Sequence, residues 1–307
     1  MPATNFPFGL SSFGVPVIGS GQIPVTSGTY IFVSSVTGSN SNDGKSLDAP
    51  VATIDYAIGL CTANKGDVII VLPGHTETIS AAGGITADIA GITIIGLGVG
   101  SNRPTISFSA TASTFAISAA NVYIANLRVT STIDEVVKMF HITAAYVTLE
   151  NIEHFETASC QTIQFILTTN AADYLIVRNC RCYQMNAAAA AQAWIQLVGI
   201  DGGIIEDNTF RLTLSNNAAS VTISGTTACI GTVVRRNTIV QLGGTTQVSA
   251  ILFVDSSTGV FVHDNRVACG STARAGGVDV GNAGYAAENY VLNTPDKSGL
   301  LDPVADA

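Results

Sequence analysis

One repeated frame appears as IIEDNTF at residues 204–210, VVRRNTI at 233–239 and FVHDNRV at 261–267. The frame is an apolar residue, two further residues, a position called Z, one more residue and a second apolar residue. Successive Z positions are separated by 30, 25, 28, 28, 29, 28 and 24 residues. A period that drifts in this way excludes a rigid helical repeat and favours short coils joined by loops of variable length. The eight Z residues are Leu97, Leu127, Ile152, Cys180, Asn208, Asn237, Asn265 and Asn289.

Each repeat is too short to enclose a core by itself. Its apolar runs are brief and β-branched, as at Thr232 to Val234, and Gly, Asn, Ser and Thr bound them. Such units gain stability only by stacking on their neighbours. The sequence therefore predicts an all-β fold, a right-handed parallel β-helix of about nine coils over residues 67–292.

The Z column changes from aliphatic residues to amides halfway along the chain. Stacked asparagines can hydrogen-bond to one another in a parallel, in-register arrangement. We therefore expect Asn208, Asn237, Asn265 and Asn289 to form a structural ladder. In the columns beside Z the charges alternate in sign between neighbouring repeats, which avoids like-charge repulsion across strands. The column just before Z is Asn126, Asn151, Asn179, Asp207, Arg236, Asp264 and Glu288.

The two ends of the chain differ from the repeats. Residues 29–66 are predicted to form an opening strand and a capping helix, because Ile54, Ala57, Ile58 and Cys61 have helical spacing. Residues 1–28 hold four prolines, five glycines and no charge, which favours an extended docking arm. Residues 293–307 read as a short polar C-terminal tail. The arm's expected contact residues are Phe6, Pro7, Phe8, Phe13, Val15, Pro16 and Ile18.

The charge balance excludes several classes of partner. The chain has 13 basic and 22 acidic side chains, a formal net charge of −9, so we expect no binding to nucleic acid or to an anionic membrane. No apolar run approaches the roughly 20 residues that span a bilayer. The first charged side chain is Asp43, so no signal peptide is expected.

The six cysteines are interpreted as buried thiols, because the sequence shows no sign of export to an oxidising compartment. Cys180 and Cys182 could instead form half of a metal site, but a second pair at zinc-site spacing is missing. We therefore expect neither a metal ion nor a cofactor.

Catalysis is also not expected. Glu206 with Asp207, and His263 with Asp264, are the isolated candidates, and the arginines at 235 and 236 fall between them in neighbouring repeats. A neighbouring arginine lowers a carboxyl pKa, whereas a general acid needs a raised one. No catalytic residue is therefore assigned. If the protein were an enzyme, the first suspects would be the acidic cluster Glu150, Glu153, His154 and Glu156.

His154 breaks the apolar frame, because it occupies a position where the other repeats have mostly aliphatic residues. We interpret it as an inward-facing core residue that is satisfied by hydrogen bonds. The alternative is that it marks a bulge.

The stretch YIFVSSVTGSNSNDGKSLDAPVATIDYAI at residues 30–58, followed by GDVIIVLPG at 66–74, resembles the first segment of the pectate-lyase-like right-handed β-helix superfamily. The opening NFPFGLSSFGVPV at 5–17 resembles the leader of β-helix proteins encoded by tailed bacteriophages and prophages. That superfamily includes polysaccharide lyases, glycoside hydrolases, tailspikes and non-enzymatic virion proteins, so the resemblance implies the fold rather than one function. Its catalytic signatures are absent, since no two aspartates are adjacent and neither His75 nor His154 precedes a glycine.

Together these features favour a bacteriophage virion structural protein, a head decoration or cement protein on the outer surface of the capsid, made in the host cytoplasm. The major capsid protein would be its partner, held by the arm, and the rods would form a homotrimer. The alternative is a tail-associated spike or receptor-binding protein that acts on host surface polysaccharide. Long, aromatic-rich loops beside one sheet would favour that alternative.

Overall fold

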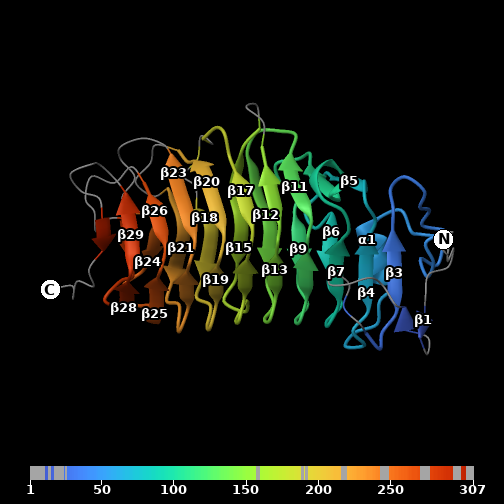
Figure 1. Ribbon diagram of the computed structural model, residues 1–307, viewed down its shortest axis with the longest axis horizontal. Coiled ribbons are helices and arrows are strands. Elements are labelled where there is room, and N and C mark those ends of the chain that lie inside the picture. The colour runs from blue at the N-terminus through green and yellow to red at the C-terminus, as the bar shows by residue number, and fades with distance from the viewer. Residues whose placement is uncertain are drawn as a thin grey trace, which may run out of the picture.

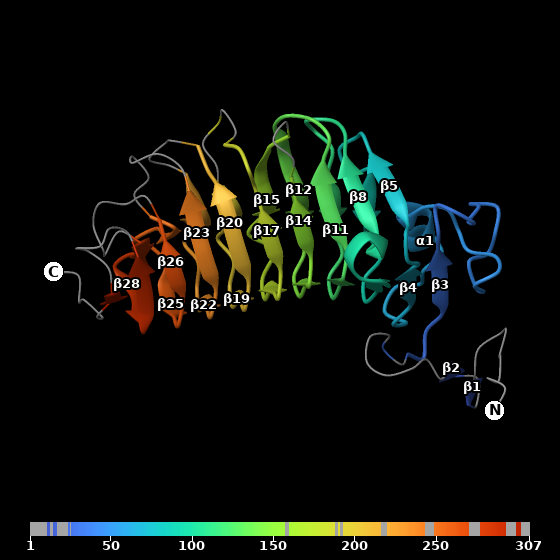
Figure 2. The ribbon, with the colours of Figure 1, turned by 45° about the horizontal axis from the view of Figure 1, so that its top comes forward.

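The computed structural model describes residues 11–12, 15–16, 24, 26–156, 160–187, 190, 193–215, 220–242, 249–269, 277–292 and 299–301. The described chain winds into a rod in which three sheets run side by side along the axis (Figures 1 and 2). Strands that neighbour one another in a sheet come from successive coils and are parallel, except for the last pair of sheet II. The parallel β-helix predicted from the repeated frame is confirmed.

Sheet I contains ten strands, and sheet II contains ten. The strands of sheet I are β3 (Tyr30–Val33), β4 (Val68–Val71), β7 (Thr93–Gly96), β10 (Tyr123–Ala125), β13 (Thr148–Glu150), β16 (Ile176–Arg178), β19 (Ile204–Glu206), β22 (Val233–Arg235), β25 (Thr258–His263) and β28 (Ala283–Ala287). Those of sheet II are β5 (Thr76–Ile79), β8 (Thr105–Phe108), β11 (Arg128–Ser131), β14 (Glu153–Phe155), β17 (Arg181–Tyr183), β20 (Thr209–Thr213), β23 (Thr238–Leu242), β26 (Arg266–Ala268), β29 (Asn289–Leu292) and β30 (Gly299–Leu301).

Sheet III completes each coil with eight strands. They are β6 (Ile85–Ala87), β9 (Phe115–Ile117), β12 (Val136–Ile142), β15 (Thr162–Thr168), β18 (Ala193–Val198), β21 (Val221–Thr227), β24 (Ile251–Phe253) and β27 (Val278–Asp279). A short 3₁₀ helix, η1 (Gly100–Asn102), precedes β8.

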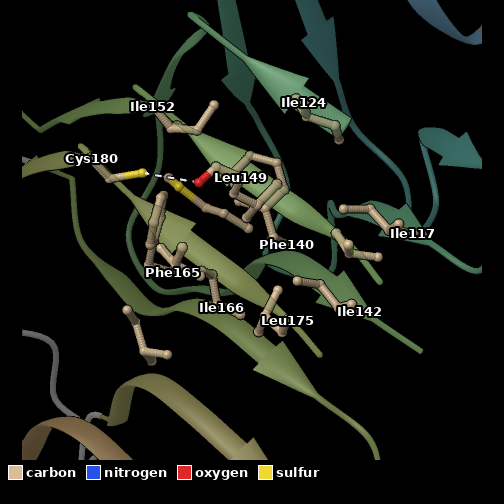
Figure 3. Packing of buried hydrophobic residues seen from close by; sticks show 14 of the residues in the cluster. Ile117, Ile124, Phe140, Ile142, Leu149, Ile152, Phe165, Ile166, Leu175 and Cys180 are labelled. Carbon is tan, nitrogen blue, oxygen red and sulfur yellow. Dashed lines mark hydrogen bonds between the residues drawn. The ribbon is translucent and has the colours of Figure 1, made fainter. Parts of the chain in front are cut away.

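The core fills the space between the three sheets. Alternate side chains of each strand point inward, so that equivalent apolar residues of successive coils lie above one another. Phe140 and Phe165 come from neighbouring coils of sheet III, and their ring centroids are 5.5 Å apart (Figure 3). Phe140 meets Phe165 edge-on, whereas Trp194 of the next coil stacks on Phe165 at 5.7 Å and is fully buried. The stacking buries apolar surface that no single coil could cover.

The corner between sheets I and II has a left-handed residue in seven successive coils. The column just before Z supplies it, with φ between 52° and 57°. Asn and Asp tolerate this conformation better than other non-glycine residues, which explains why they occupy five of these seven positions. The sequence analysis treated this column only as a place of alternating charge, although its asparagines were the signal for the turn.

The capping helix is shorter than the segment that suggested it. Helix α1 (Ile54–Gly59) begins after Thr53, whose side chain accepts a hydrogen bond from the backbone N–H of Tyr56. Ile54 and Ile58 are buried, and the helix packs against β3, β4 and β6 at the N-terminal end of the rod (Figure 1). Cys61 follows the helix and is half-buried. No helix in the described part of the chain has the length and apolarity needed to cross a membrane.

Within the predicted arm, β1 (Ser11–Ser12) and β2 (Val15–Pro16) form a two-stranded antiparallel sheet. The other predicted contact residues of the arm, Phe6, Pro7, Phe8, Phe13 and Ile18, lie outside the described residues.

The prediction of a simple polar tail at residues 293–307 is corrected by the structure, because part of this segment pairs with the last coil. Residues 299–301 return as β30 and pair antiparallel with β29. The added strand covers the edge of sheet II, which would otherwise present unpaired backbone groups.

Candidate functional site

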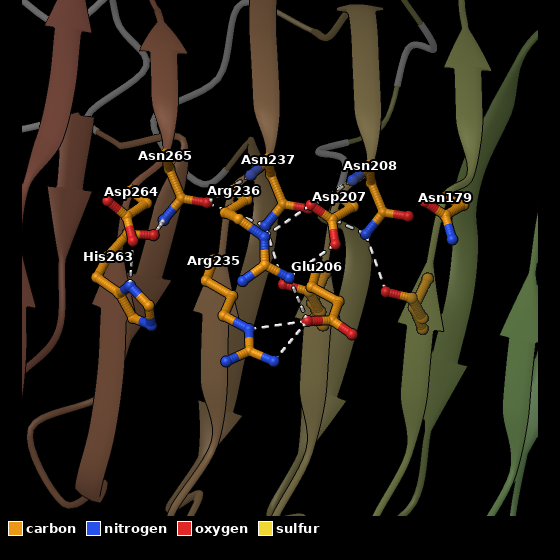
Figure 4. Close-up of polar contacts among 12 residues, drawn as sticks. Asn179, Glu206, Asp207, Asn208, Arg235, Arg236, Asn237, His263, Asp264 and Asn265 are labelled. Carbon is orange, nitrogen blue, oxygen red and sulfur yellow. Dashed lines mark hydrogen bonds and ion pairs between the residues drawn. The ribbon is translucent and has the colours of Figure 1, made fainter.

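The four Z asparagines form a continuous hydrogen-bonded ladder inside the corner between sheets I and II. Figure 4 shows Asn208, Asn237 and Asn265 of this ladder. The Nδ2 atoms of Asn208 and Asn237 each donate to Oδ1 of the next asparagine at 3.0 Å, and that of Asn265 does so at 2.9 Å. Each Oδ1 also accepts from a backbone N–H of the preceding coil, beginning with Cys180 at 2.8 Å. All four side chains are buried, so the ladder is a structural element.

Outside this ladder, charged side chains pair between coils. Arg235 and Arg236 both contact the Glu206 carboxylate, at 2.7 and 2.8 Å, and Arg236 also contacts Asp207 at 2.8 Å (Figure 4). The hydrogen bonds from Arg236 lower the pKa of Asp207. The imidazole of His263 lies 2.7 Å from Asp264, and its hydrogen bond lowers the pKa of that carboxyl. The carboxyls of Asp207 and Asp264 are therefore held in the ionised form, which a general acid cannot use.

Glu150 is held in the same way on the outward side of β13. Burial raises its pKa, but hydrogen bonds from the Tyr123 hydroxyl at 2.8 Å and from Arg178 at 2.7 Å outweigh burial and lower it overall. Partial burial and the hydrogen bond to Glu150 raise the pKa of Tyr123 to about 12. Glu150 is thus an ion-pair acceptor rather than a proton donor at neutral pH.

The four suspects for catalysis do not converge on one site. Glu150 faces outward from sheet I and Glu153 faces outward from sheet II, where Arg128 binds it at 2.7 Å. His154 and Glu156 point into the interior, with no exposed side-chain surface. These four residues are close in sequence but not in space. Side chains alternate between the two faces of β14, and the corner before β14 turns the chain from sheet I to sheet II, so neighbouring residues point to different faces.

His154 and Glu156 form a buried pair in the core. The Nε2 atom of His154 lies 3.1 Å from Oε1 of Glu156. The imidazole packs edge-on against Trp194, with ring centroids 4.8 Å apart. The interpretation of His154 as an inward-facing core residue is confirmed, but it is hydrogen-bonded through Nε2 only, because Nδ1 has no partner among the described residues. Neither side chain is accessible to a substrate.

All six cysteines are free thiols, and five of them are buried. Burial raises the pKa of Cys180 to about 12, which disfavours the thiolate that a metal ion would need. Within the described ranges, no group of three or more His, Cys, Asp or Glu side chains is placed to hold a metal ion.

Two exposed aromatic pairs were missed by the sequence analysis. Phe155 and Tyr183 stack at 5.6 Å on the outward face of sheet II. Tyr146 and Tyr174 stack at 4.8 Å before β13 and β16. Each pair lies beside a shallow open hollow, of about 440 Å³ next to Phe155 and about 360 Å³ next to the tyrosines. Their spacing by 28 residues, one coil, was the signal that could have found them.

Asp207 is expected to titrate below the usual range of an aspartate, and Arg236→Gln should bring its pKa back toward that range. Folding lowers the pKa of Asp207, so its ion pair with Arg236 stabilises the fold at pH values above the unfolded-state pKa. This stabilisation is lost as the pH falls through the folded-state pKa. The energetic effect should be small, because the pair is exposed. Carboxyl ¹³C NMR titration would measure the pKa.

Arg211→Gln is the matched control for this titration, because Arg211 is equally exposed and contacts a ring rather than a carboxylate. An Asp207 pKa that stayed low in the Arg236 variant would contradict the assignment.

Known proteins resemble this chain only distantly. No family model matches the sequence, and no curated protein matches it. Among solved structures, a rhamnogalacturonan lyase matches with a TM-score of 0.41 and 13% identity over 89% of this chain and 87% of that one. The pectate lyase Pel9A matches with a TM-score of 0.49 and 15% identity over 78% and 63%. A GH136 lacto-N-biosidase from Eubacterium ramulus matches with a TM-score of 0.40 and 12% identity over 87% and 68%.

Proposed function

We propose that this protein is a non-catalytic virion component of a bacteriophage, a head decoration or cement protein whose arm at residues 1–28 attaches it to the major capsid protein. The observation that carries the proposal is the pairing of the outward carboxylates Glu150, Glu153, Glu206, Asp207 and Asp264 with cationic or imidazole side chains. A rod of this kind offers rigidity and a repeating surface, on which these five carboxylates are held by partners from neighbouring strands or residues.

The arm supports the proposal by its composition. It joins three phenylalanines and four prolines to a complete absence of charge, and aromatic side chains are the usual anchors of protein interfaces. Three rods in a homotrimer would present three such arms to the capsid, and this would raise the avidity without strong individual contacts.

Co-sedimentation with undecorated capsid shells of the phage that encodes the chain tests the proposal. We expect the full-length protein to bind the shells, and the triple variant Phe6→Ala, Phe8→Ala, Phe13→Ala to bind at least about tenfold more weakly, because anchor residues carry most of the binding free energy. The matched control is Phe155→Ala, which removes an exposed aromatic ring from the rod instead of the arm. Shells that bound no form of the protein would rule out decoration.

The second candidate is a tail-associated spike or receptor-binding protein that acts on host surface polysaccharide. The specific observation in its favour is the presence of the two exposed aromatic pairs beside open hollows. Depolymerisation of host polysaccharide, lost on substitution of Glu150 or Glu153, would favour this candidate over decoration.

A further inference from the structure

The outward face of sheet II is the cationic side of an acidic protein. From β8 to β26 its charged residues are four arginines and one glutamate, a local balance of +3 in a chain whose net charge is −9. Only Arg128 is paired with that glutamate at short distance, 2.7 Å from Glu153. Among the described residues, no carboxylate lies within ion-pair distance of the other three, which are Arg181, Arg211 and Arg266.

An aromatic stack stands among these arginines. Phe155 and Tyr183 are nearly parallel, at an interplanar angle of 13°, and the guanidinium carbon of Arg211 lies 4.9 Å from the centre of the Tyr183 ring. Tyr183 therefore covers the side of Phe155 that faces the C-terminal coils. On the other side of Phe155 is the hollow, which Thr105, Arg128, Thr130 and Glu153 also line. Phe155 is 48% exposed, so its ring is accessible from this hollow.

The hollow has the chemistry of a saccharide subsite. An aromatic wall can stack on the apolar face of a sugar ring, while hydroxyl groups of the sugar need both donors and acceptors. Arg128 supplies donors, Glu153 supplies acceptors, and the threonines supply hydroxyls that can serve as either. A volume of about 440 Å³ lies within the range of small-molecule sites.

The unpaired arginines extend the site along the rod. Arg181 and Arg266 are three coils apart, about 14 Å at the usual strand spacing of about 4.8 Å. This length exceeds one sugar ring and suits a chain with repeated negative charges. We propose that the outward face of sheet II binds an anionic glycan, with one residue stacked on Phe155 and carboxylate or phosphate groups near Arg181, Arg211 and Arg266. This inference goes beyond the decoration role, because it gives the rod itself a ligand, and it deepens the second candidate function, which rests on the same aromatic pair and hollow.

Other polyanions fit less well. A nucleic acid would meet the negative charge of the rest of the chain, whose formal net charge is −9. A peptide that bound by adding a strand would need a free sheet edge, whereas the strands that carry these residues are paired on both sides.

Binding by the full-length protein should be measured by calorimetry with four probes: alginate oligosaccharides for carboxylates, glycerol-phosphate teichoic acid for phosphates, dextran as a neutral glycan, and single-stranded DNA. We expect binding to one or both anionic glycans, weakened by salt, and no binding to dextran. Phe155→Ala and the double variant Arg181→Gln, Arg211→Gln should each weaken it at least about tenfold. The matched control Tyr146→Ala removes an equally exposed stacked ring that has no arginine partner, and affinity should stay within about twofold.

The result that would overturn the proposal is binding to neither anionic glycan, or equally tight binding to dextran. Binding to DNA that Phe155→Ala leaves unchanged would show a non-specific polyanion surface instead. An equal loss in the Tyr146→Ala variant would place the ligand on another face. Failure of the arm to bind capsid shells would not affect any of these outcomes, because shell binding depends on the arm and glycan binding on the outward face of sheet II, and Phe155→Ala serves only as a control in the capsid test.

Discussion

Asn237→Leu is expected to lower the free energy of unfolding by about 2–5 kcal/mol, because it removes a buried amide in the middle of the ladder. The Oδ1 atom of Asn237 accepts from the backbone N–H and from Nδ2 of Asn208, both at 3.0 Å. Its Nδ2 donates to the backbone carbonyl of Ile205 at 2.9 Å and to Asn265 at 3.0 Å. Leucine has a similar size but leaves the Asn208 N–H without its acceptor, away from water. A buried donor or acceptor left unpaired costs about 1–3 kcal/mol.

Urea denaturation of the wild type and the variant would measure this change. Thr238→Leu is the matched control, because it introduces the same side chain one residue later at an exposed position. Asn237→Asp separates the two halves of the amide, since it keeps an acceptor for Asn208 and loses the donor to Ile205. A midpoint for Asn237→Leu as high as that of Thr238→Leu would mean that the ladder adds no stability.

The ladder also shows which parts of the structure were readable in the sequence. The frame around Z contains the end of a sheet I strand, a two-residue corner and the start of a sheet II strand, so its repetition sets the register of both sheets. Sheet III has no such frame, because connections of varying length lead into it from sheet II. Its strands, such as β12 and β15, were therefore implied by closure of the coil rather than recognised individually.

The aromatic and arginine residues on the outward face of sheet II were harder to predict. They lie far apart in sequence and come together only because the coils stack. Glu150, Glu153, His154 and Glu156 are close in sequence, and the corner before β14 separates them onto three surfaces. Phe155, in contrast, finds Tyr183 and the arginines from other coils. Alternation can indicate that a residue faces outward, but which outward residues combine depends on the register over several coils.

The second large effect on stability is expected at the buried pair of His154 and Glu156. Glu156→Leu is expected to lower the free energy of unfolding by about 3–5 kcal/mol, the usual cost when one partner of a buried polar or ionic pair is removed. The loss leaves the Nε2 atom of His154 without its hydrogen bond, among Phe165 and Trp194. Glu156→Gln keeps an oxygen at the same place and should cost less.

A double-mutant cycle separates the free energy of the His154–Glu156 hydrogen bond from the cost of the cavity that each smaller side chain leaves. His154→Phe alone strands the Glu156 carboxyl in an apolar interior, whereas His154→Phe with Glu156→Leu removes both polar groups from the core. Because an apolar replacement of a complete buried pair is often neutral, the double variant should be more stable than either single variant. The coupling free energy should be about 1–3 kcal/mol by urea denaturation. If the two single losses simply added, the pair would contribute through volume alone, and the hydrogen bond at 3.1 Å would have no measurable share in the stability of the rod.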